Sequence, residues 1–137
     1  KAEFNSKSIN ESLARIITAG FIMPLDPTIE ALSDVKTAVS EAVTNCIVHA
    51  YPDELGTITL RCRLLKDHVL DIVIKDKGVG ISDLEQARRP MFTTGGADRS
   101  GMGFTVMETF MDSVSVDSIP GVGTKVTLFK QIGKNRL

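Results

Sequence analysis

The sequence predicts one α+β domain, residues 1–137, in which a mostly antiparallel mixed sheet carries its helices on one face. Three observations lead to this class. Apolar residues recur with helical spacing in two segments before residue 51, and they alternate with polar residues in two segments between residues 57 and 75. A further helix and two strands follow residue 100. A chain of 137 residues is long enough for one such domain.

The first half of the chain is expected to hold an edge strand, Ala2–Ser6, and two helices. Asn10 is a suitable N-cap for the first helix, over about Glu11–Met23. Its buried stripe would consist of Leu13, Ile16, Ile17 and Phe21. Pro27 suits the first turn of a longer helix, Pro27–Ala50. The apolar face of that helix would be formed by Ile29, Leu32, Val35, Val39, Val43 and Cys46.

The second half begins with a predicted antiparallel hairpin. Thr57–Leu65 and His68–Lys75 alternate, are rich in β-branched residues and are joined at Lys66-Asp67. A short helical turn at Ser82–Gln86 and a loop without periodicity, Arg88–Ser100, are expected next. The last elements would be the helix Gly101–Met111 and the strands Val114–Asp117 and Thr124–Lys130.

Composition and charge narrow the classes of function. A formal net charge of −1 argues against a nucleic-acid binder that relies on a broad positive field. No segment has the pattern of a signal peptide or a membrane span, so no membrane partner is expected. Cys46 and Cys62 lack metal-binding spacing, and we expect buried, reduced thiols in a cytoplasmic protein. Because the sequence begins at Lys1, a few native residues are expected to precede it.

A polar stripe on the long helix is the first candidate for chemistry. Glu41, Asn45 and His49 lie four residues apart, so a regular α-helix would place them on one face. A carboxylate, a carboxamide and an imidazole can supply a base, a metal ligand and a hydrogen-bonding group. Taken alone, a solvated polar face is the better interpretation of this pattern.

Glycine turns supply the other candidates. Asp76, Gly78 and Gly80 follow a strand, where glycines let a ligand approach the backbone and the carboxylate can accept from an amino group. The turn Ser100–Phe104 opens a helix, whose free amides can bind an anion. The turn Gly121–Thr124 leads into a strand. Each of these is also typical of ordinary turn chemistry.

In their order along the chain these motifs resemble the family of ATP-binding domains shared by type II topoisomerases, the Hsp90 chaperone, histidine kinases and the MutL mismatch-repair protein, known as GHKL. The likeness is closest to the serine-kinase branch, and there to the sporulation anti-sigma factors. It is carried by the runs NESLAR (10–15), LDPT (25–28), SEAVTN (40–45), HAY (49–51), FTT (92–94) and RSGMGFTVME (99–108).

The resemblance implies a two-layer α/β sandwich that holds ATP or ADP with Mg²⁺ beneath a mobile lid. Glu41 would be the general base, Asn45 would be a Mg²⁺ ligand, and Arg99 in the lid would neutralise γ-phosphate charge. His49 would either contact the nucleotide or brace the end of the helix.

The same resemblance implies a nucleotide-binding set. Asp76 would bind the adenine amino group with help from Thr124. The other implied nucleotide contacts are Gly78, Gly80, Thr93, Thr94, Ser100, Gly101, Met102, Gly103 and Phe104. Relatives usually have Lys-Pro after the position of Thr94, where this chain has Gly95-Gly96.

The function implied is that of an anti-sigma factor that inhibits a sporulation sigma factor and, with Mg-ATP, phosphorylates a serine of an anti-anti-sigma protein. Glu11 and Arg15, placed on the exposed side of the first helix, are candidate sigma-factor contacts, although without the resemblance solvent-facing charges are the better interpretation. A homodimer formed near the first strand and helix is also implied. The alternatives are a general stress-response kinase of the same branch and a nucleotide-gated binding module with little catalysis.

Overall fold

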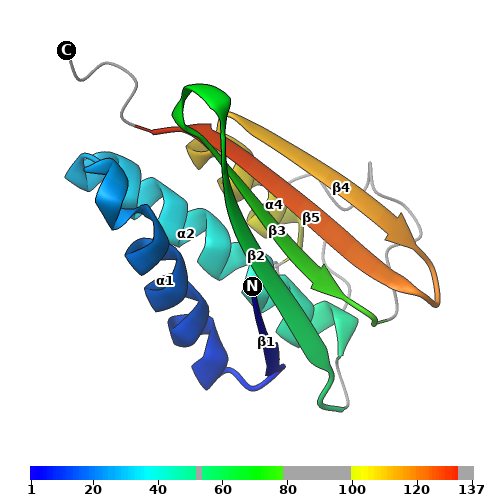
Figure 1. Cartoon of the computed structure of the whole chain (residues 1–137). Coiled ribbons are helices and arrows are strands. Elements are labelled where there is room, and N and C mark those ends of the chain that lie inside the picture. Colours follow the sequence, from blue (N-terminus) through cyan, green and yellow to red (C-terminus); the bar gives the residue numbers. More distant parts are fainter. Residues whose placement is uncertain (52–53, 79–99, 133–137) are drawn as a thin grey trace.

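A five-stranded sheet forms one layer of the molecule (Figure 1). The computed structural model describes residues 1–51, 54–78 and 100–132. Within them the strand order is β1-β2-β3-β5-β4, and all four pairings are antiparallel. The strands are β1 (Ala2–Asn5), β2 (Thr57–Leu65), β3 (Val69–Asp76), β4 (Ser113–Ile119) and β5 (Gly123–Gln131). The predicted α+β class is therefore confirmed, with β3 in the centre and β1 at one edge.

The second layer consists of helices that cover one face of this sheet, with α2 between α1 and α4 (Figure 1). The helices are α1 (Ile9–Ile22), α2 (Ile29–Asn45) and α4 (Ser100–Phe110). Thr28 caps α2, since its hydroxyl accepts from the Ala31 N–H at 3.0 Å. A π-helical turn, Cys46–Ala50, continues α2 without a break.

The hydrophobic core lies between the helices and the inner face of the sheet. Inward positions alternate along β2 and pair with those of β3, for example Leu60 with Ile74. The fully buried aliphatic side chains are Ile22, Val35, Val39, Val43, Ile58, Leu60, Leu70, Ile72, Ile74, Leu128 and Ile132. This packing fixes the C-terminal end of α2 against the end of β3, where Asp76 lies.

The buried face predicted for α1 is wrong. Leu13 and Ile16 are 41% and 68% exposed and Phe21 is also exposed, whereas Ala14 and Thr18 are buried. Only Ile17 of the predicted stripe packs against the core. Both sides of this helix carry apolar residues at helical spacing, so periodicity predicts the helix but does not select the side. The side with small residues is the one that packs.

Two further expectations about the helices are corrected. Asn10 lies inside α1, whose N-cap is Ser8, and its Nδ2 instead donates to the main-chain oxygen and Oδ1 of Asn5, both at 2.9 Å. Ile29, expected on the buried face of α2, is 88% exposed because it stands in the first turn, beyond the sheet contacts. The elements expected at Ser82–Gln86 and 88–99 lie outside the described residues.

Candidate nucleotide site at the ends of α2 and β3

Asp76, the last residue of β3, lies at the centre of the candidate site and is only 6% exposed. Its Oδ1 accepts from the main-chain N–H groups of Gly78 at 2.9 Å and Thr124 at 3.2 Å. Its Oδ2 accepts from the thiol of Cys46 at 3.4 Å. Burial raises the pKa of Asp76, and these three hydrogen bonds lower it in part. The carboxylate is thus held in one orientation by three separate segments.

Thr124 begins the opposite wall of this site, on β5. It is buried, and its hydroxyl lies 2.8 Å from the hydroxyl of Ser118 on β4. The Ser118 hydroxyl also donates to the main-chain oxygen of Gly123 at 3.3 Å. Three strands therefore meet at the carboxylate, since β3 supplies Asp76, β5 supplies Thr124, and β4 fixes the Thr124 side chain.

Two glycines allow the close approach of these segments. A Cβ added at Gly78 would lie 2.2 Å from the main-chain oxygen of Ala50, and one added at Gly123 would lie 2.3 Å from that of Asp76. Gly123 also has a φ of +151°, which L side chains rarely adopt. Gly78 was expected to make room for a ligand; within the described residues it makes room for the main chain of Ala50, at the end of the π-helical turn.

Tyr51 joins the end of the long helix to the two neighbouring strands. Its hydroxyl donates to the main-chain oxygen of Thr57 at 2.8 Å and accepts from the N–H of Lys77 at 2.7 Å. Its ring packs over Gly56, where an added Cβ would lie 2.1 Å from a ring carbon. Because Lys77 directly follows Asp76, this phenol fixes the chain that leaves the carboxylate.

The polar stripe of α2 is only partly regular. Glu41 and Asn45 lie in the α-helix and are half-buried, whereas His49 lies in the π-helical turn Cys46–Ala50. In that turn the Tyr51 N–H donates to the main-chain oxygen of Cys46, five residues back, at 3.2 Å. The prediction that all three residues share one α-helical stripe is therefore wrong for His49. Such π turns are frequent at functional sites.

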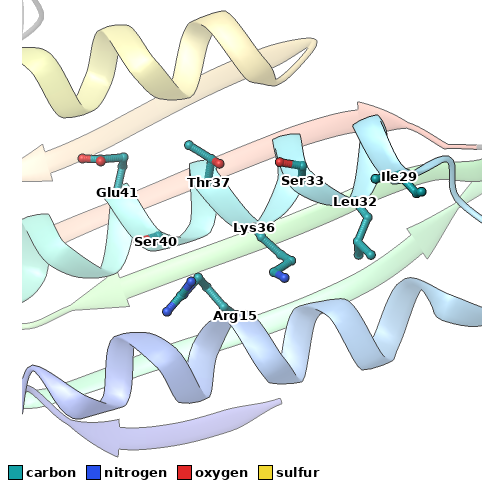
Figure 2. A pocket seen from close by; sticks show the side chains of 8 residues that line it. All are labelled: Arg15, Ile29, Leu32, Ser33, Lys36, Thr37, Ser40 and Glu41. Atoms are coloured by element: carbon teal, nitrogen blue, oxygen red, sulfur yellow. The ribbon is translucent and has the colours of Figure 1, made fainter.

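A groove of about 360 Å³ runs along α2 and faces α1 (Figure 2). Glu41 lies at one end and Ile29 at the other, and Arg15 reaches into the groove from α1. The remaining lining residues are Leu32, Ser33, Lys36, Thr37 and Ser40. The predicted base therefore borders an open groove rich in hydroxyl groups.

Glu11 and Arg15 were expected on the exposed side of α1, and this expectation is wrong. They form an ion pair at 2.5 Å, and both side chains are partly buried on the side of the helix that faces α2. The exposed side carries Ile9, Leu13 and Ile16 instead. The error has the same origin as the inverted face of α1.

The donors present fit a magnesium ion held mainly by a nucleotide. No group of three or more His, Cys, Asp or Glu side chains that could hold a metal occurs in the described part of the chain. Asn45 is half-buried and its side-chain oxygen is of the kind that Mg²⁺ prefers, whereas its Nδ2 is buried without a hydrogen-bond partner among the described residues. Mg²⁺ needs few protein ligands when phosphates and water supply the rest.

Sequence reasoning placed Asp76, Gly78 and Thr124 in one site, and the structure brings these three together. Ser100–Gly103 form the first turn of α4, and Phe104 has its side chain in the core. Gly80, Thr93, Thr94 and Arg99 lie outside the described residues.

Sequence reasoning missed the roles of Cys46, Ser118 and Tyr51. Each of them makes a contact between segments that are separate in the chain, and no local pattern signals such a contact.

The model of the histidine kinase-like ATPase domain matches residues 10–130. The anti-sigma F factor of Caldanaerobacter subterraneus subsp. tengcongensis is 56% identical over 135 residues, which cover 98% of this chain and 94% of that protein. The chain belongs to the histidine kinase-like ATPase family, among the anti-sigma F factors. The anti-sigma F factor of Bacillus subtilis is 50% identical over 135 residues, 98% of this chain and 92% of that protein.

Solved structures show the same fold at much lower identity. The histidine kinase domain of the Erythrobacter litoralis EL346 blue-light activated histidine kinase superposes with a TM-score of 0.60 at 22% identity. That match covers 78% of this chain and 47% of the kinase domain, so the chain spans about half of its length. No helix in the described ranges is both long and apolar enough to cross a membrane.

Proposed function

We propose that this family member is an anti-sigma factor that binds Mg-ATP and transfers its γ-phosphoryl group to a serine of an anti-anti-sigma protein. The observation that carries the nucleotide part is the Asp76 carboxylate. It is buried, held by two main-chain N–H groups and a thiol, and has no ion-pair partner among the described residues. A buried carboxylate held this firmly is suited to accept from the amino group of a purine.

The α2 residues supply the proposed chemistry. Glu41, at the end of the open groove, is placed to accept a proton from an incoming hydroxyl, and general-base help of this kind contributes about 10²–10⁴-fold to rate. Asn45, one turn further along, would hold Mg²⁺ through its side-chain oxygen. When bound, Mg²⁺ neutralises charge that develops on the phosphates. Arg99 would add a positive charge from the lid, and His49 stays a candidate nucleotide contact.

The partners follow from the family. The relatives' name supports a sigma factor as the inhibited partner. The groove between α1 and α2 supports a protein substrate, because an acceptor segment lying in it would pass Arg15 and reach Glu41. We infer that the Glu11–Arg15 pair contacts the sigma factor from the rim of this groove.

A homodimer is proposed on the opposite side of α1. Ile9, Leu13 and Ile16 form an exposed apolar stripe there, and β1 is an edge strand with one free side. An exposed apolar stripe beside an edge strand is typical of an interface, because contact with a partner removes the apolar side chains from water and a free strand edge can pair with another strand.

The test combines recovery of partners with phosphoryl transfer. Tagged protein is incubated with a lysate from a related spore-forming bacterium and Mg-ATP, and the retained proteins are identified. The retained substrate candidate is then purified and incubated with γ-labelled ATP. We expect a co-purifying sigma factor and label on a serine of the second partner. ATP binding without transfer to any serine would favour the nucleotide-gated module instead.

An Asp76→Asn variant tests nucleotide recognition separately from phosphoryl transfer. Its side chain is nearly isosteric but presents an NH₂ group on one side, and loss of a hydrogen bond to a charged group costs about 1.5–3 kcal/mol. We expect ATP affinity to fall about tenfold to a hundredfold by calorimetry. Unchanged affinity would remove Asp76 from the site.

A further inference from the structure

Cys46 contacts one oxygen of the Asp76 carboxylate, and the main-chain donors Gly78 and Thr124 contact the other. Its Sγ lies 3.4 Å from Oδ2 of Asp76, although the two residues are 30 positions apart. Cys46 is 3% exposed and Asp76 is 6% exposed, so water does not compete for this hydrogen bond. Cys46 is the first residue of the π-helical turn, and its own main chain is still α-helical, with its N–H donating to the main-chain oxygen of Ala42.

The two oxygens of Asp76 have different surroundings. Oδ1 accepts two main-chain hydrogen bonds, from Gly78 and Thr124, and its two lone pairs are therefore in use. The Cys46 thiol is the hydrogen-bond donor found for Oδ2 among the described residues. One acceptor position remains on Oδ2, and a purine amino group would have to use it.

We propose that Cys46 is a positioning residue for Asp76: its S–H bond fixes the plane of the carboxylate, so that Oδ2 offers its remaining lone pair to the 6-amino group of adenine. This inference rests on the proposed nucleotide-binding function. It assigns to a buried thiol, which composition alone marks as ordinary core, a part in the choice of base.

A thiol suits this position because it is a weak donor. It restrains the carboxylate but withdraws little of the electron density that an amino group needs. Burial, and next to it the Asp76 charge, raises the pKa of the Cys46 thiol well above its ordinary value, which agrees with a group that donates.

Three substitutions separate the donor from the packing. Cys46→Ser and Cys46→Ala leave nearly the same empty volume, but only serine keeps a donor. Cys46→Val fills the volume and has no donor. Cys62→Ala is the matched control, since that thiol lies on β2 near the Thr18 hydroxyl, with 4.0 Å between Sγ and Oγ1. Melting curves of all four variants verify that each is folded.

The measurement is the ratio of dissociation constants for IDP and ADP, determined by calorimetry with Mg²⁺ present. IDP carries a 6-oxo group where ADP has an amino group, so the ratio reports recognition at Oδ2. We expect this ratio to fall about threefold to tenfold in Cys46→Ala and Cys46→Val, to recover at least in part in Cys46→Ser, and to stay unchanged in Cys62→Ala.

Equal ratios in the wild type, Cys46→Ala and Cys46→Ser would overturn the inference, and so would recovery by valine but not by serine. Both of these results would leave the proposed nucleotide binding intact. Failure of the wild-type protein to bind ADP would instead overturn the proposed function, and the inference with it.

Discussion

The main-chain N–H of Thr124 donates to Oδ1 of Asp76 at 3.2 Å and so joins the start of β5 to the end of β3 across 48 residues of sequence. This contact puts a buried carboxylate, rather than a turn, at the centre of the candidate site. Burial raises the pKa of this carboxylate in the folded protein, and the hydrogen bonds from Gly78, Cys46 and Thr124 offset part of that rise.

The stability of the nucleotide-free protein should depend on the ionisation of Asp76. Because the folded state binds this proton more tightly than the unfolded state, the stabilising contribution is present below the unfolded pKa and is lost as pH rises through the raised folded pKa. We expect Asp76→Asn to lack this loss in urea unfolding measured over the acidic range. Glu108→Gln, at an exposed position of α4, should keep the wild-type profile. Identical profiles for Asp76→Asn and wild type would contradict the burial cost.

Gly78→Ala should destabilise the protein by about 1–3 kcal/mol, because the new Cβ would meet the main-chain oxygen of Ala50. Gly20→Ala is its control, since nothing lies within 4 Å of the added atom in the last turn of α1. There the substitution should stabilise by about 0.5–1 kcal/mol. Thermal unfolding measures both effects. Equal melting temperatures for the two variants would show that the chain around Gly78 shifts to accommodate the added Cβ, and would contradict the predicted loss of stability.

Tyr51→Phe removes one hydroxyl that serves two main-chain groups, Thr57 O and Lys77 N–H. We expect a loss of about 1–3 kcal/mol in urea unfolding, since the Lys77 N–H then lacks this partner. Thr109→Val removes an exposed hydroxyl that also bonds to a main-chain oxygen, that of Thr105, and should change the unfolding free energy far less. If both variants unfold like the wild type, Tyr51 does not fix the chain after Asp76.

Ile16→Glu should convert the proposed homodimer to a monomer, because it places a charge within the exposed apolar stripe of α1, at a side chain that is 68% exposed. Ile29→Glu is a control of the same chemistry on α2, at a side chain that is even more exposed. Sedimentation velocity compares the three proteins. A monomeric wild type would contradict the proposed homodimer, and a dimer in all three proteins would place the interface away from this stripe.

The sequence predicts an element well where its residue pattern favours a single arrangement. The strand Thr57–Leu65 was predicted with its observed bounds, because alternation and β-branched residues agree along its whole length. The face of α1 could not be predicted, because Leu13 and Ile16 on one side compete with Ala14 and Ile22 on the other. Which side packs depends on how closely the helix approaches the sheet, and that is a tertiary property.

The candidate site shows the same limit. Asp76, Gly78 and Thr124 stand beside recognisable turns, and their grouping was predicted. The thiol of Cys46 was predicted to be buried on the apolar face of the helix, but its bond to Asp76 joins residues 30 positions apart, and no local residue pattern signals such a pair. The structure therefore adds to the sequence-based prediction the contacts between segments that are far apart in the chain.

Phosphoryl transfer by Glu41→Ala, measured beside its ATP affinity, tests the central claim most directly. The Glu41 side chain borders the groove at α2 and forms no hydrogen bond to Asp76 or Thr124 in the described part of the chain, so its removal should leave ATP affinity within about twofold while transfer to serine falls by about 10²-fold or more. Wild-type transfer with unchanged affinity would contradict its role as general base. An equal collapse of affinity and transfer would show that Glu41 supports the structure of the site instead.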